Sequence, residues 1–127
     1  MTAPSPAENA PPTARLEQQL AFALEIDRLK EVWRQTWLID GSRRENGAEH
    51  SWELAVMALL LGEHAGESTL DLLRVLQMLL IHDLVEIDAG DTFVYDQAAE
   101  RDRLQRERAA ADRLFGMLPA DQARQFR

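Results

Sequence analysis

The feature that most constrains the fold is a strongly apolar stretch, residues 69–87, in which His82 and Asp83 interrupt a run of aliphatic side chains. Its length and composition predict a helix, and Gly90 is expected to end it. Such a helix packs into a core, where an unpaired imidazole or carboxylate is costly because it loses its hydration. We therefore expect a buried helix whose His82-Asp83 pair is neutralised by partners or binds a metal ion.

Further helices are predicted around this segment, because apolar residues recur at intervals of three to five and helix-end residues flank them. The expected helices cover residues 15–34, 49–64 and 97–118, and a short last helix opens at Pro119. The polar, glycine-containing stretch 40–47 and the short stretch 92–95 are predicted loops. Helices are therefore the expected secondary structure, and no strand is predicted.

The domain organisation is simple. Residues 1–14 read as a disordered Pro- and Ala-rich tail, and residues 15–127 as one domain. A chain of 127 residues can bury one usable core. Because the sequence stops at Arg127 inside an expected helix and without a C-cap, we expect a truncated chain whose final helices are missing.

Composition excludes several classes of function. With 14 Lys and Arg against 22 Asp and Glu, the formal net charge is −8, which argues against nucleic acid as a partner because that affinity rests on basic side chains. Individual arginines can still bind a small phosphorylated ligand. The absence of cysteine leaves His, Asp and Glu as the metal ligands. No apolar run suits a membrane span and no signal peptide is recognisable, so we expect a cytoplasmic protein without a membrane partner.

The candidate chemistry lies around His82 and Asp83. Glu86 follows His82 by four residues and so lies one turn further along the same face, and Asp91 could turn back over the helix end. His50, 32 residues before His82, is at the start of a helix expected to pack antiparallel to it, so two histidines and an aspartate would converge. The alternative is that Asp83 and Glu86 are exposed, His82 is a satisfied core histidine, and His50 is exposed or caps its helix.

The order of these residues resembles the HD-domain metal-dependent phosphohydrolases, over about residues 29–118. The full set of motifs is similar to that of the branch of small HD proteins that includes bacterial 5′-deoxynucleotidases. The motifs that carry this resemblance are Arg34-x-x-Trp37, Gly41, Glu45, Ala48-Glu49-His50-Ser51, Ile81-His82-Asp83-x-x-Glu86 and Gly90-Asp91.

The resemblance implies an all-α, HD-domain-like helical bundle, incomplete at the C-terminus, with one divalent metal cation, namely Mn, Co, Mg or Zn. The implied metal ligands are His50, His82 and Asp83, with one more aspartate from a later helix to which we assign no residue of this chain. Three ligands can hold a metal with additional waters.

The resemblance also implies roles around the metal. Glu86 and Asp91 would orient the attacking water or pass a proton to the leaving group. Arg34 would clamp the phosphate, since a guanidinium fork suits a monoester dianion. Trp37 would either contact the sugar and base of a substrate or pack in the core. We favour core packing.

The function expected from these residues is a metal-dependent phosphohydrolase, a 5′-deoxynucleotidase-like phosphomonoesterase acting in nucleotide metabolism. Its expected substrate is a small phosphorylated metabolite, namely a nucleoside or deoxynucleoside 5′-monophosphate. A phosphodiesterase, or a hydrolase of another phosphorylated metabolite, is a sister alternative. An alternative of a different class is a non-catalytic or decayed HD module, which would act as a binding scaffold or pair with a second copy as a homodimer.

Overall fold

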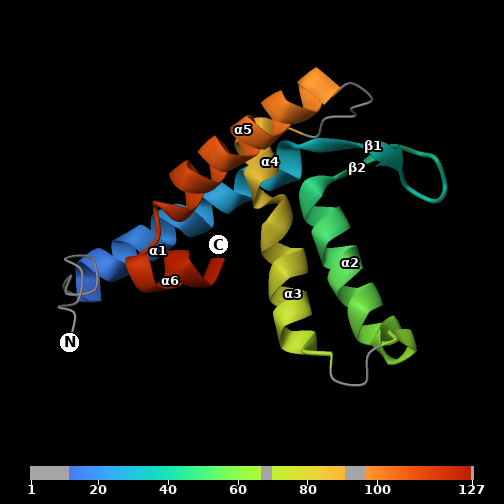
Figure 1. The fold of residues 1–127 in the computed structure, drawn as a ribbon, viewed down its shortest axis with the longest axis horizontal. Helices are drawn as coiled ribbons and strands as arrows, with labels where there is room; N and C mark the ends of the chain where they lie inside the picture. The colour runs from blue at the N-terminus through green and yellow to red at the C-terminus, as the bar shows by residue number, and fades with distance from the viewer. Residues whose placement is uncertain (1–11, 67–69, 91–96, 127) are drawn as a thin grey trace.

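The computed structural model describes residues 12–66, 70–90 and 97–126. Most of this part of the chain is helical, with one small hairpin (Figure 1). The α-helices are α1 (Pro12–Ile26), α2 (Gly47–Leu61), α3 (Leu72–Ile81), α4 (Glu86–Ala89), α5 (Gln97–Phe115) and α6 (Ala120–Phe126). Short 3-10 helices are η1 (Asp27–Glu31), η2 (Gly62–His64) and η3 (His82–Val85), and the strands are β1 (Trp33–Trp37) and β2 (Arg44–Asn46).

The first helix differs from the expectation. Instead of running over 15–34, it begins at Pro12, passes into η1 after Ile26 and is followed by strand β1. Strand β1 pairs antiparallel with β2, with Trp33 opposite Asn46 and an irregularity before the Trp37 pair. Aromatic and β-branched residues favour strands, which explains why this segment leaves the helix although its apolar spacing suits one. The predicted loop 40–47 is therefore a hairpin turn that continues into β2 and the first residue of α2.

The hairpin delivers the chain directly into α2. The Asn46 side chain accepts a hydrogen bond from the Glu49 backbone N–H at 2.9 Å, and the Glu49 carboxylate accepts one from the Asn46 N–H at 3.1 Å. These reciprocal bonds form a capping box, which satisfies backbone donors that a helix start leaves open. A Cβ added to Gly47 would lie 2.6 Å from Leu29 Cδ1, so the absence of a side chain lets α2 begin close against η1.

The apolar stretch expected as one helix over 69–87 consists of three pieces. Helix α3 is capped by the Asp71 side chain, which accepts from the Arg74 N–H at 3.1 Å, and η3 and α4 follow it. Gly90, with φ of 74°, ends α4 as predicted, because glycine adopts this left-handed region without a Cβ clash. The prediction that this stretch is buried is wrong for α3, which has no buried residue. It is correct for η3 and α4, where Asp83, Leu84 and Ile87 are buried.

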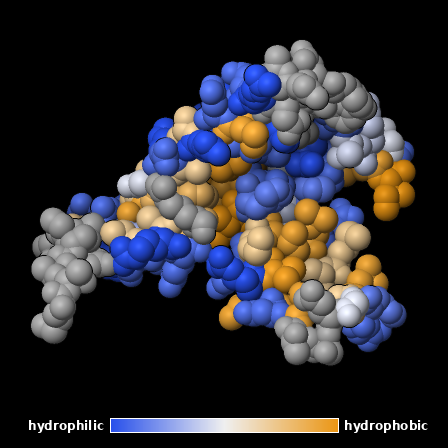
Figure 2. All heavy atoms as spheres, viewed as in Figure 1, coloured by the Kyte–Doolittle hydropathy of each residue, from blue (hydrophilic) through white to orange (hydrophobic). Residues whose placement is uncertain are grey.

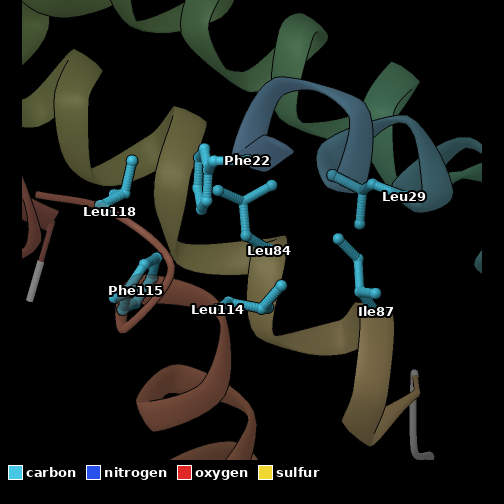
Figure 3. Packing of buried hydrophobic residues seen from close by; sticks show 7 residues of the cluster. All are labelled: Phe22, Leu29, Leu84, Ile87, Leu114, Phe115 and Leu118. Carbon is cyan, nitrogen blue, oxygen red and sulfur yellow. The ribbon is translucent and has the colours of Figure 1, made fainter. Parts of the chain in front are cut away.

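The core lies where α1, η1, η3, α4 and α5 meet. In Figure 3 its seven labelled side chains converge from these elements and from the segment after α5; they are Phe22, Leu29, Leu84, Ile87, Leu114, Phe115 and Leu118. Leu114 of α5 is fully buried. The C-terminal α6 closes one end of the core, since the Phe126 ring packs edge-on against Phe22 and Phe115. The core therefore fixes η3, and with it His82 and Asp83, against α1 and α5.

Helices α2 and α3 extend away from this core as an antiparallel pair (Figure 1). Many of their large apolar side chains are exposed, among them Trp52, Leu60 and Leu73, and the apolar surface over this pair is visible in Figure 2. Within the described residues no helix combines the length and the hydropathy needed to cross a bilayer. The expected loop 92–95 and most of the expected tail lie outside the described residues.

Candidate functional site

Arg34 of β1 lies at the centre of the candidate site. Its guanidinium contacts three carboxylates, at 3.5 Å from Nε to Glu45 Oε1, 3.6 Å from NH1 to Asp83 Oδ2 and 3.4 Å from NH1 to Glu86. Hydrogen bonds to both oxygens of Glu86 are formed at the same 3.4 Å. The Arg34 side chain is only 18% exposed. The hairpin thus brings a largely buried cation over the segment that holds Asp83 and Glu86. We call Arg34, Glu45, Asp83 and Glu86 the Arg34 cluster.

Asp83 is the most deeply buried member, with a side chain 4% exposed. Ser51 of α2 donates a hydrogen bond to its Oδ2 at 3.5 Å, and His82 Nδ1 lies 3.0 Å from its Oδ1. The His82 side chain is 66% exposed. The alternative in which Asp83 is exposed and His82 is a core histidine is therefore wrong, since the two residues have the opposite environments.

His50 lies in the first turn of α2, where the capping box positions it. Its Nδ1 is 2.8 Å from Glu45 Oε1, and the Thr36 hydroxyl donates a hydrogen bond to the same oxygen at 2.6 Å. His50 is partly buried, so the simple exposed histidine considered above is also wrong. Because Glu45 and Asp83 both contact Arg34, His50 and Asp83 belong to one contact network that joins β1, β2, α2 and η3.

Other candidate residues lie at the edge of this network or outside it. Trp37 is 58% exposed and the Arg44 guanidinium carbon lies 5.7 Å from its ring centroid, so the favoured core-packing role of Trp37 is wrong. The Arg43 guanidinium pairs with Glu49 at 2.6 Å. The hydrogen bonds between these two side chains raise the pKa of Arg43 and lower that of Glu49. Asp91 lies outside the described residues.

The side chains at this site are of the types that bind divalent cations, namely imidazole and carboxylate. Both imidazoles hold Nδ1 against a carboxylate, which leaves Nε2 as the ring nitrogen for a ligand, as in many histidine metal sites. Asp83 adds a buried carboxylate. In the described part of the chain, however, no three His, Asp or Glu side chains are grouped closely enough to hold a metal ion. The donor types therefore fit a cation, while a closed ligand set is not assembled from these residues.

The electrostatics of the Arg34 cluster are unbalanced. One guanidinium faces three carboxylates, so the cluster carries two negative charges in excess when the carboxylates are ionised. Buried charges are costly unless they are compensated. The cluster therefore favours an additional positive charge close to Asp83.

Comparison with known proteins identifies the family of this chain. The sequence profile of the HD domain matches residues 26–127. The chain belongs to the HD domain family. The match includes β1, β2 and every helix from η1 onward, so the hairpin that carries Arg34 is within the HD domain of this protein.

Individual relatives have named activities. The 5′-deoxynucleotidase HDDC2 of Xenopus laevis is 30% identical over 101 residues, which cover 79% of this chain and 48% of that protein. The human 5′-deoxynucleotidase HDDC2 is 28% identical over 103 residues, covering 80% of this chain and 48% of that protein. The chain thus spans about half the length of the curated relatives it matches.

One solved structure has a higher sequence identity to this chain than these relatives have. It is the crystal structure of a "predicted metal-dependent phosphohydrolase" from Magnetospirillum magnetotacticum MS-1, 57% identical, with a TM-score of 0.83. The similarity covers 91% of this chain and 57% of that one. The expected all-α, HD-like bundle is therefore confirmed, with the small hairpin as an addition to it.

The residues that sequence reasoning missed as members of the site are Glu45, Ser51 and Thr36. Glu45 is part of the family motif, but no role was predicted for it because it lies in a polar stretch without hydrophobic periodicity. Its burial depends on pairing between β1 and β2, which the predicted helix over 15–34 excluded. A buried carboxylate five residues before a candidate histidine ligand would have been the signal had the hairpin been recognised.

Proposed function

We propose that this chain is the HD portion of a metal-dependent phosphohydrolase that releases phosphate from a small phosphomonoester. The observation that carries the proposal is the Arg34 cluster, in which a largely buried guanidinium contacts the buried Asp83 and the partly buried Glu86 beside the His82-Asp83 pair. Membership in the HD family and the similarity to the "predicted metal-dependent phosphohydrolase" from Magnetospirillum magnetotacticum support the reaction class.

We assign the metal to His50, His82 and Asp83, with waters or further donors completing its coordination. A bound divalent cation makes hydroxide available near neutral pH and stabilises charge on phosphoryl oxygens. The native metal is one of Mn, Co, Mg or Zn, which His and Asp donors all accept.

The remaining roles fall to side chains of this chain. Arg34 binds the phosphate dianion, because its planar fork of donors matches phosphate oxygens and it already lies beside Asp83. Glu86 lies one turn after His82 and orients the attacking water or transfers a proton to the leaving alkoxide. We keep Asp91 as a second residue for that proton transfer. Trp37, exposed at the hairpin, contacts the sugar and base.

For the substrate we propose a deoxynucleoside 5′-monophosphate. The named activity of the Xenopus laevis and human relatives supports this class. The exposed Trp37 ring offers a flat apolar surface, which suits stacking against a nucleobase.

The decisive experiment is metal analysis of the purified chain combined with a phosphate-release screen. Nucleoside and deoxynucleoside 5′-monophosphates would be tested with Mn²⁺, Co²⁺, Mg²⁺ and Zn²⁺, against a simple phosphodiester as the competing substrate class. We expect metal-dependent release from the monophosphates, with deoxyribose preferred. A folded chain that binds none of the four ions and releases no phosphate would favour the non-catalytic HD module instead.

A further inference from the structure

Three side chains meet at one oxygen of Glu45. The Thr36 hydroxyl donates a hydrogen bond to Glu45 Oε1 at 2.6 Å, His50 Nδ1 lies 2.8 Å from it, and Arg34 Nε lies 3.5 Å from it. Glu45 is itself buried, with 8% of its surface exposed. A carboxylate with so little solvent contact depends on these protein partners for its compensation.

The distance between Glu45 and His50 fixes where a proton lies. A carboxylate oxygen and an unprotonated imidazole nitrogen both present lone pairs, and two lone pairs repel each other at 2.8 Å. A hydrogen on Nδ1 removes this repulsion and donates to the carboxylate. In the neutral ring, Nε2 then carries the free lone pair, which is the form that a metal requires.

The same oxygen also bears on the candidate phosphate-binding residue. Arg34 Nε is buried without a hydrogen-bond partner, and Glu45 Oε1 is the acidic atom beside it. The carboxylate attracts the Nε end of the guanidinium, while the NH1 end contacts Asp83 and Glu86. Glu45 thus contributes to the orientation of the Arg34 side chain.

We propose that Glu45 is a positioning residue for both halves of the site: it holds His50 in the Nδ1–H tautomer and orients Arg34 from the same oxygen. The inference rests on the proposed function for the roles of His50 as metal ligand and Arg34 as phosphate ligand. The hydrogen placement itself stands on the distances alone. A structural role for Glu45 would change stability without selecting a tautomer of His50.

The test is nitrogen-15 NMR of the imidazole rings in the chain without added metal, at about pH 8, where an ordinary imidazole is neutral. We expect His50 of the wild type to be in the Nδ1–H form. In Glu45→Met, which removes the acceptor and keeps a chain of similar length, we expect a shift towards the Nε2–H form. Glu45→Gln retains a neutral acceptor oxygen, and we expect it to keep more of the Nδ1–H form than Glu45→Met.

The control is an exposed histidine–glutamate pair elsewhere in the chain. His64 Nε2 lies 3.2 Å from Glu63, and both side chains are mostly exposed. Glu63→Met should leave the His50 spectrum unchanged. Finding His50 as Nε2–H in the wild type would overturn the inference, and so would an unchanged tautomer in a folded Glu45→Met variant.

A second measurement links the inference to the proposed site. Isothermal titration with Mn²⁺ should give a dissociation constant about 10- to 100-fold higher in Glu45→Met than in the wild type, the usual cost of losing a partner behind a metal-binding histidine. Titration with inorganic phosphate in the presence of Mn²⁺ should also weaken, because Arg34 loses its Nε contact. Equal Mn²⁺ affinity in the two proteins would overturn the positioning role.

The two proposals can fail separately. If the wild type binds no Mn²⁺, the proposed function fails, while the tautomer of His50 still decides whether Glu45 orients the ring. If the wild type binds Mn²⁺ and His50 is Nε2–H, the proposed function stands and the role of Glu45 is lost.

Discussion

Two clusters of charge in this protein use the same residue types in different ways. In the Arg34 cluster the side chains are at most 18% exposed, and the contacts to the guanidinium are 3.4 to 3.6 Å long. The second cluster, which we call the Arg113 cluster, joins Arg113 of α5 to Glu25 of α1 and Asp88 of α4. Its hydrogen bonds are 2.5 to 2.8 Å long, and Arg113 is 42% exposed.

The difference separates a structural contact from a candidate site. Short bonds in the Arg113 cluster hold the pKa of Glu25 below, and that of Arg113 above, their ordinary values, as expected when opposite charges satisfy one another. In the Arg34 cluster the charges are buried, the bonds are long and the carboxylates outnumber the cation. An arrangement that is poorly compensated and yet buried favours a further ligand over stability alone.

The largest expected effect comes from exchanging one aspartate in each cluster. We expect Asp83→Asn to reduce metal-dependent phosphate release by at least about 100-fold, because it removes a carboxylate assigned to the metal. Asp88→Asn, five residues further on in the Arg113 cluster, should leave turnover within about twofold, as usual for a charge remote from the chemistry. The measurement is the initial rate of phosphate release at saturating metal. Similar rates in the two variants would remove Asp83 from the site.

The next effect concerns the two arginines. We expect Arg34→Gln to raise the KM for the phosphomonoester about 10- to 100-fold, since a charged hydrogen bond contributes about 1.5–3 kcal/mol and about 1.4 kcal/mol corresponds to tenfold. Arg113→Gln should leave KM unchanged. Steady-state kinetics with both folded variants compare them directly. An unchanged KM and kcat in Arg34→Gln would show that Arg34 does not bind the phosphate.

A smaller effect is expected on stability. Arg113→Gln should lower the free energy of unfolding by less than about 1 kcal/mol, because exposed ion pairs are screened by water and salt. Urea unfolding followed by circular dichroism measures this change. A loss of several kcal/mol would mean that the Arg113 cluster is a main support of the packing between α1, α4 and α5, and would weaken the distinction between the two clusters.

The smallest effect is in the pH dependence of stability. Hydrogen bonds from Arg113 and Arg28 lower the pKa of Glu25 from its ordinary 4.5. A carboxyl group with a lowered pKa in the folded state stabilises the fold above its unfolded pKa, and this contribution is lost as the pH falls through the folded pKa. Stability should thus decrease below pH 4.5, less steeply in Arg113→Gln than in the wild type. Parallel curves for the two proteins would contradict the pairing.

Much of the helical framework follows from local sequence. The capping box of α2 joins two residues three positions apart, Asn46 and Glu49, and α2 starts within two residues of the predicted position. Helix α5 begins at Gln97 as expected and stops three residues earlier. Gly90 ends its helix by a conformational preference that requires no tertiary contact. These features are predictable because their causes lie within a few residues.

For the candidate site, the sequence proposes residues but does not predict their environments well. The expected buried pair is divided, with Asp83 buried and His82 exposed, because η3 turns the two side chains to different sides. Arg34 and Glu86 are 52 residues apart in sequence. Their contact depends on the hairpin, where the spacing of apolar residues had predicted a helix that includes Arg34. Glu45 owes its role to the same hairpin. Pairing across such distances is set by tertiary packing, which local periodicity does not report.

The change from α3 to the tighter η3 at His82 limits which insertions and deletions this region can accept. With about three residues per turn, side chains three positions apart lie almost directly above one another, so Asp83 and Glu86 turn towards the same partner, Arg34. One residue added or removed between them would rotate Glu86 by about a third of a turn, away from the guanidinium. The number of residues between these two carboxylates is therefore constrained to two, and one of them, Leu84, is further constrained because it packs in the core.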